Sequence, residues 1–120
     1  VNDITKFTSP QAWIAKQKQL YQILKHKFSP QLTIASGVPP MDQFPALPNP
    51  LAWLFGQYAK AMNLKLGQFV AQQKQMEWIE YDLKKFLTLN LAMAKDGFHP
   101  SKEIYQCWGK QVAEKIRQSF

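Results

Sequence analysis

The residues of this chain that could form a nucleophilic site are one cysteine and two histidines. Cys107 is the single cysteine, and His99 precedes it by eight positions. A thiol with an imidazole base beside it could act as the nucleophile of an acyl transfer. Cys107, however, falls in the middle of a predicted helix, and no glycine-rich turn that could supply an oxyanion hole surrounds it. We interpret Cys107 as a structural residue.

Three carboxylates form the other group of potentially reactive side chains: Glu77, Glu80 and Asp82. A metal site would need further ligands at suitable spacing, and His26 and His99 are far apart in the sequence. The five glycines are scattered and make no phosphate-binding pattern. We therefore expect no catalytic, metal-binding or cofactor-binding residues, and a protein that is not an enzyme.

The elements that would position these residues are predicted to be helices. Ser9 and Pro10 have the residue types of a helix N-cap and first helical position, and Ser29-Pro30 ends a helix at Phe28. Near the C-terminus, Ser101 is the expected N-cap of a final helix within residues 99–120. Its apolar residues recur every four positions: Ile104, Trp108, Val112 and Ile116.

Residues 29–50 contain six of the eight prolines. Proline lacks an N–H donor and fixes its backbone angle, so this spacing predicts neither a helix nor a central strand. The segment also carries apolar residues, among them Leu32, Ile34 and Phe44. We interpret it as an extended strap packed against the helices; the alternative is a mobile connector whose apolar side chains serve a partner.

Residues 51–95 contain no proline and have helix-like apolar spacing. A straight helix of that length would span about 67 Å at 1.5 Å per residue. We favour one long helix kinked at Gly67; the alternative is a break near Gln72–Gln75 that gives two antiparallel helices. The predicted fold is all-α and a single domain, 1–120, composed of residues 1–28, 29–50, 51–95 and 99–120.

Aromatic side chains are numerous, with four Trp, four Tyr and eight Phe. Their helical spacing favours packing in the core, but Trp and Tyr are also enriched at protein interfaces. We predict a central seam of Met62, Phe69 and Met76, and an aromatic anchor on the last helix. The candidate interface residues are Tyr105, Trp108, Met62, Phe69, Met76 and Trp13.

The net charge of +7 is uneven along the chain. Residues 1–76 hold eight Lys and two acidic residues, and residues 77–120 hold seven basic and six acidic residues. A basic portion could contact nucleic acid, an anionic surface or an acidic protein. Because 14 of the 15 basic residues are Lys, which lack the bidentate fork of Arg, a solvated Lys-rich surface is favoured over a nucleic-acid-associated module.

One segment of the chain resembles a known family. Residues 96–108, followed by Ala113-Glu114, resemble part of the accessory subunit of class III polyhydroxyalkanoate synthases (PhaE). The matching positions are Ser101, Ile104, Tyr105, Trp108, Ala113 and Glu114, and Phe44-Pro45-Ala46-Leu47 is similar to the segment that enters the long helix of that family. The resemblance implies a non-catalytic helical subunit that binds and activates a separate polyester synthase at a granule surface.

The sequence-based hypothesis is therefore a partner subunit that binds another protein, or a second copy of itself, and needs no cofactor. The alternatives are a Lys-rich nucleic-acid-associated module and a phasin-like amphipathic protein that binds granules or membrane surfaces. No apolar run approaches the length of a transmembrane helix, and no signal peptide is visible after Val1. We expect a cytoplasmic protein, with association to granules as an option, and a chain that begins without Met is compatible with a fragment.

Overall fold

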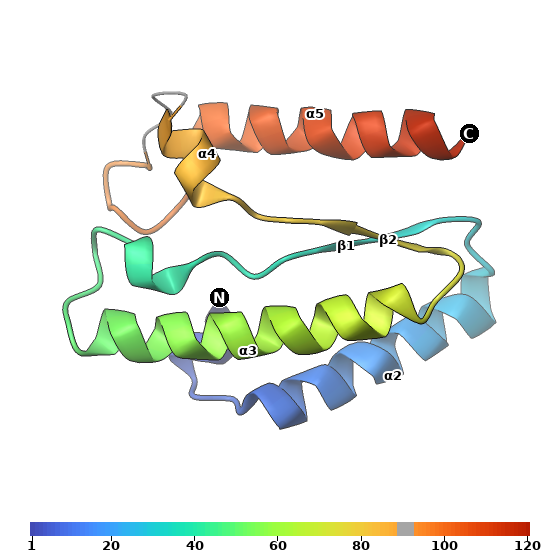
Figure 1. Cartoon of the computed structure of the whole chain (residues 1–120), viewed down its shortest axis with the longest axis horizontal. Coiled ribbons are helices and arrows are strands. Elements are labelled where there is room, and N and C mark those ends of the chain that lie inside the picture. Colours follow the sequence, from blue (N-terminus) through green and yellow to red (C-terminus); the bar gives the residue numbers. More distant parts are fainter. Residues whose placement is uncertain (89–92) are drawn as a thin grey trace.

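The computed structural model describes residues 1–88 and 93–120, and within them it contains helices and a small sheet (Figure 1). The elements in chain order are α1 (Asn2–Thr5), α2 (Pro10–Phe28), β1 (Thr33–Ser36), the 3-10 turn η1 (Met41–Gln43), α3 (Leu51–Ala71), β2 (Met76–Ile79), α4 (Leu83–Thr88) and α5 (Lys102–Ser119).

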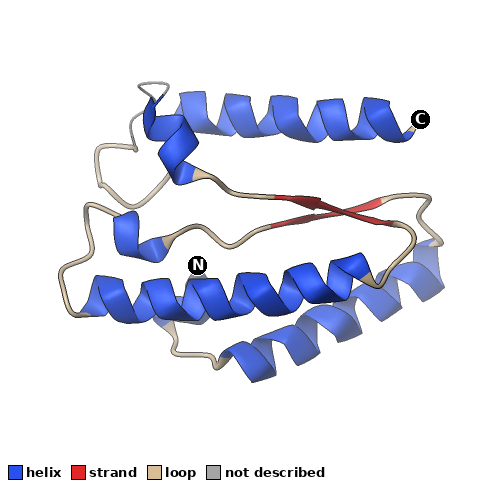
Figure 2. Cartoon of the chain, viewed as in Figure 1, coloured by secondary structure: helices blue, strands red, loops and turns tan. Residues whose placement is uncertain are grey.

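The two strands are parallel and form one ladder, with Thr33 opposite Met76 and Ser36 opposite Ile79. Parallel neighbours cannot be joined by a tight turn and need a long crossover, which is most often a helix. Here α3 provides that crossover, so β1, α3 and β2 make a β-α-β unit. The strand pair is central to the molecule (Figure 2), with α3 and α2 on one side and α5 on the other.

The prediction of an all-α fold is wrong: the fold is mixed α/β, although most of it is helical. β1 lies inside the segment that we expected to exclude a central strand. Between Pro30 and Pro39 this segment has eight positions without proline, 31–38, and these are enough for a four-residue strand. The sheet has only two strands, so β1 pairs on one edge and the neighbouring prolines do not interrupt a ladder.

The continuous helix over residues 51–95 is also not observed. The helix passes through Gly67 without ending and stops at Ala71, where the polar run Gln72–Gln75 begins. This position matches the alternative break, but the chain continues into β2 and not directly into a second helix. The apolar stripe has no residue to bury in this run, so helix extension gains nothing there. The chain measures 41 Å along its longest axis, well short of an unbroken rod.

The ends of α2 and the start of α5 are confirmed. The Ser9 side chain accepts a hydrogen bond from the Ala12 N–H at 3.2 Å, Pro10 is the first helical residue, and the helix ends at Phe28. The Ser101 side chain accepts from the Ile104 N–H at 3.3 Å. Both are N-cap interactions that depend only on nearby residues, which is why the sequence predicts them.

The core lies where α1, α2, α3 and the segments after β1 and β2 meet. Ile4, Met41, Met62, Phe86 and Ile104 are the largest side chains that are almost completely buried. Aromatic pairs in edge-to-face contact extend this core, such as Tyr21 with Phe69 at 5.6 Å between ring centroids. Six different elements (α1, α2, η1, α3, α4 and α5) therefore contribute to one apolar interior.

The two glycines of α3 are expected to respond in opposite ways to replacement by Ala. A Cβ at Gly56 would lie 2.6 Å from the Cβ of Asp42 in η1, whereas a Cβ at Gly67 would meet nothing within 4 Å. Gly67→Ala should raise the free energy of unfolding by up to about 1 kcal/mol through helix propensity. Gly56→Ala should lower it by about 1–3 kcal/mol because the chain after β1 is displaced. Urea denaturation of both variants measures the difference, and equal effects would contradict this packing.

A candidate binding cavity beneath helix α5

An apolar cavity of about 430 Å³ lies between the chain that follows β1 and the start of α5. This volume falls within the range of about 300–1,000 Å³ that is typical of small-molecule sites. Its wall is largely aromatic: Phe44 contacts Phe98 edge-to-face at 5.5 Å, and Tyr81 contacts Trp108 at 6.2 Å. The walls come from segments that are far apart in the sequence, so only the folded chain forms the cavity.

Helix α5 contributes Tyr105 and Trp108 to this wall. Three interactions define the start of this helix and hold it in place, and the last of them joins it to β2. The Ser101 cap sets its start, Ile104 is 1% exposed beneath its first turn, and Lys115 Nζ lies 3.0 Å from Glu77 Oε2 in β2. Tyr105 is 51% exposed at the same end of the helix. The helix therefore holds one aromatic ring inside the wall and a second one at its rim.

Three polar atoms on residues that line the cavity are sealed from solvent: Ser36 Oγ, Tyr81 OH and Trp108 Nε1. None of them has a hydrogen-bond partner within residues 1–88 and 93–120. A buried polar group without a partner costs about 1–3 kcal/mol relative to a satisfied one. Such groups are rare in folded proteins, and each one calls for an explanation. Their gathering around one cavity marks this region as the candidate functional site.

The pKa of Tyr81 is raised to about 12 from its ordinary value of 10, first by burial of the phenol and second by the neighbouring Tyr105. Between pH 10 and about 12 the phenol therefore stays neutral in the folded state but is ionised in the unfolded state. Its contribution to stability is complete below pH 10 and is lost as the pH rises through about 12. Ultraviolet titration of tyrosinate should show one late transition, and Tyr81→Phe should remove it. If that variant keeps the late transition, Tyr81 is not the buried phenol.

The loop that leads into α5 forms one side of the cavity and is held by Asp96. Its Oδ1 accepts hydrogen bonds from the N–H groups of Phe98 and His99 at 2.9 Å each, and its Oδ2 lies 2.5 Å from His99 Nδ1. These contacts, led by the His99 side chain, lower the pKa of Asp96 far below its usual range. Gly97 has a φ of +66° in this turn, a left-handed conformation that glycine adopts without strain.

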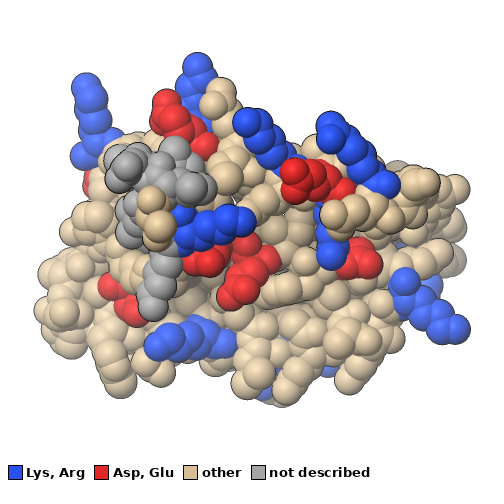
Figure 3. Space-filling model, turned by 45° about the horizontal axis from the view of Figure 1, so that its top comes forward, with Lys and Arg blue, Asp and Glu red and all other residues tan. Residues whose placement is uncertain are grey.

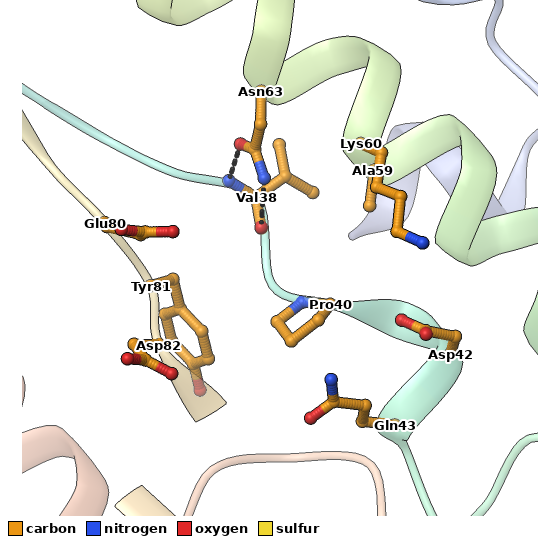
Figure 4. Close-up of a pocket in the computed structure, with 10 residues that line it drawn as sticks. All are labelled: Val38, Pro40, Asp42, Gln43, Ala59, Lys60, Asn63, Glu80, Tyr81 and Asp82. Atoms are coloured by element: carbon orange, nitrogen blue, oxygen red, sulfur yellow. Dashed lines mark hydrogen bonds between the residues drawn. The ribbon is translucent and has the colours of Figure 1, made fainter. Parts of the chain in front are cut away.

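A second, more polar pocket of about 230 Å³ shares Tyr81 with the cavity (Figure 4). Asn63 of α3 holds the backbone of Val38 there through two hydrogen bonds. Its Oδ1 accepts from the Val38 N–H at 2.6 Å, and its Nδ2 donates to the Val38 carbonyl at 2.9 Å. This clamp fixes the path of the chain between β1 and η1, and with it one wall of each pocket.

The carboxylates singled out in the sequence are spread around this region. Glu77 pairs with Lys115, and Asp82 accepts a hydrogen bond from the Lys85 N–H at 3.0 Å at the start of α4. Glu80 and Asp82 line the second pocket (Figure 4). Within the described part of the chain, no group of three or more His, Cys, Asp and Glu residues could hold a metal ion. Cys107 is half-buried and packs against the core.

The six candidate interface residues fall into two groups. Trp13, Met62 and Phe69 are 8%, 1% and 7% exposed in the core, and Met76 is half-buried in β2. A partner could reach these four only if the fold opened or the sheet were displaced. Tyr105 and Trp108 lie together at the cavity, and Tyr105 is accessible. Ser36, Tyr81 and Asn63 were not identified from the sequence, because nothing in the spacing of single Ser, Tyr or Asn residues indicates a tertiary contact.

Charge on the face that carries α5 is mixed, with basic and acidic side chains next to one another (Figure 3). This face is not a continuous basic surface. No helix among the described residues is both long and apolar enough to cross a bilayer. No protein-family model, no curated protein and no solved structure matches this chain.

Proposed function

We propose that this chain is a non-catalytic subunit that binds another protein through the exposed apolar side of α5. The observation that supports it is the course of the apolar stripe along this helix. Successive residues of the stripe, four positions apart, advance by about 40° around the helix axis, because a turn takes 3.6 residues. Ile104 is 1% exposed at the start of the stripe, and Ile116 is 44% exposed near its end.

Tyr105 and Ile116 lie on nearly the same side of α5, because eleven residues make about three full turns. Val112 lies between them and is half-buried. The stripe is thus buried in the core at the start of the helix and open to solvent near its end. A row of a tyrosine and two branched aliphatic residues matches the apolar centre of a protein interface.

Charged residues of both signs border this row. Glu103, Lys110, Glu114 and Arg117 are all exposed on α5, and Figure 3 shows the two signs intermingled on this face. An apolar centre with a mixed polar rim suits a protein partner better than a nucleic acid, which would favour a single positive sign. The proposal therefore commits to a protein as the occupant.

The resemblance of residues 96–108 to PhaE-type accessory subunits nominates a partner. It includes Ser101, which caps α5, Ile104, which is buried at its start, and Tyr105 and Trp108, which line the cavity. We propose the catalytic subunit of a class III polyester synthase as the protein to test first. In this role the present chain would contribute binding and activation, and the synthase would contribute the nucleophile.

Co-purification of the two proteins from a co-expression strain tests this proposal. Tyr105→Ala and Ile116→Lys should each reduce the recovered complex at least about tenfold, the effect expected when an interface hot spot is truncated. Leu64→Lys is the matched control, because Leu64 is 64% exposed on α3, on the other side of the molecule. No complex with the wild-type chain, or equal loss with all three variants, would refute the proposal.

A further inference from the structure

We infer that the cavity beneath α5 binds a small neutral organic molecule, mostly apolar, that carries a hydrogen-bond acceptor oxygen such as a carbonyl. Tyr81 and Trp108 contact each other within its wall and both carry an unpartnered polar atom, as Ser36 also does. This inference does not depend on the proposed protein partner. It concerns the inside of the cavity, whereas the proposed partner binds the exposed apolar stripe of α5.

The chemistry of the unpartnered atoms selects an acceptor. The indole N–H of Trp108 can only donate a hydrogen bond, whereas the hydroxyl groups of Ser36 and Tyr81 can donate or accept. An acceptor oxygen is therefore the kind of group that each of the three side chains can bind. At neutral pH the Tyr81 phenol is protonated, as an ordinary tyrosine with a pKa of about 10 also is, so it can donate a hydrogen bond.

The rest of the lining selects a neutral and largely apolar body. The described residues around the cavity include no Lys, Arg, Asp or Glu. His99 lies at the edge, and its Nδ1 is engaged by Asp96. A charged ligand would lose its hydration in this site and would meet no Lys, Arg, Asp or Glu side chain of opposite charge. The aromatic rings of Phe44 and Phe98 instead offer apolar surface.

Access to the three polar atoms requires a movement of the wall, because they are sealed from solvent in this conformation. Tyr105 is the natural gate: it lines the cavity, it is 51% exposed, and it is close enough to Tyr81 to affect the pKa of that phenol. Rotation of an exposed tyrosine side chain is fast and needs no change of the backbone. An incoming acceptor could then replace Tyr105 beside the Tyr81 hydroxyl.

The test uses cyclohexanone and cyclohexane, which have the same ring size and differ by one carbonyl group. The indole N–H signals of the four tryptophans are followed by heteronuclear NMR of the full chain, and Trp108→Phe assigns the signal of Trp108. Cyclohexanone should shift the Trp108 signal saturably, and cyclohexane should shift it little. Trp53, which is 60% exposed on α3, is the internal control.

Two variants sharpen the result. Ser36→Ala and Tyr81→Phe each remove one hydroxyl, and each should weaken binding of cyclohexanone by about threefold to tenfold, the value of one neutral hydrogen bond. Ile116→Lys should preserve this binding, because Ile116 does not line the cavity, although the same variant is expected to disrupt the protein complex. Equal responses to the two probes, or no saturable shift of Trp108, would overturn the inference and leave the proposed protein contact untouched.

Discussion

Replacement of Phe69 by Ala should lower the free energy of unfolding by about 3–5 kcal/mol, the usual cost of deleting a buried phenyl ring. Phe69 is 7% exposed and contacts Tyr21 edge-to-face at 5.6 Å, and Lys18 Nζ lies 5.7 Å from its ring centroid. The ring therefore joins α3 to α2. Removing it leaves a cavity between the two helices and also deletes an aromatic pair.

Urea denaturation followed by circular dichroism measures this effect. Leu64→Ala is the matched control on the same helix, because Leu64 is 64% exposed and its truncation should change stability by less than about 0.5 kcal/mol. The comparison also bears on function. If Phe69→Ala were tolerated as well as Leu64→Ala, the ring would not be part of the core, and its predicted role in a contact with a partner would regain support.

Replacement of Asn63 by Ala should cost about 2–4 kcal/mol, which is large for a polar side chain. Two part-buried backbone groups of Val38 lose their partner at once, and each unsatisfied group costs about 1–3 kcal/mol. Asn63→Asp is informative, because a carboxylate can still accept from the Val38 N–H but cannot donate to the Val38 carbonyl. We expect it to destabilise the chain as well, since one oxygen would face another.

Gln57→Ala is the control for the clamp. Gln57 is an exposed amide residue on the same helix, so its loss should change the free energy of unfolding by less than about 0.5 kcal/mol. Urea midpoints of the three variants decide the matter. A chain that tolerates both Asn63 variants would show that the path from β1 to η1 is held by other contacts, and the shared wall of the two pockets would not depend on this side chain.

The parts of the fold that the sequence predicts are those determined by neighbouring residues. Ser9 and Ser101 cap their helices through an N–H three positions later, and Ser29-Pro30 ends α2. Such signals lie within a few residues of one another, so they can be recognised without knowing the tertiary structure.

The parallel strand pair could not be predicted in this way. Each strand has four residues, β1 contains only two β-branched ones, and β2 continues an apolar spacing that also fits a helix. What makes them strands is their pairing across 43 positions, from Thr33 to Met76. A short apolar run is ambiguous between helix and strand until its partner is known.

Only some residues of the candidate site could be predicted from the sequence. Tyr105 and Trp108 are aromatic residues on a clear helix, so their spacing drew attention to them. Ser36, Tyr81 and Asn63 gain their significance from neighbours on other elements, and single polar residues of these types carry no pattern. The cavity exists because β1 ends beside the loop before α5, a consequence of the β-α-β connection that the all-α prediction did not contain.

The central proposal is that α5 buries its first turn in the core at Ile104 and leaves the apolar side of its last turns exposed at Ile116, where a partner protein covers it. Hydrogen exchange of backbone amides, measured with and without the catalytic subunit of a class III polyester synthase, tests it most directly. We predict that in the free chain residues 112–119 exchange much faster than the middle of α3, and that they become protected when the synthase is added. Equal protection of both helices in the free chain, with no change on addition of the synthase, would contradict the claim.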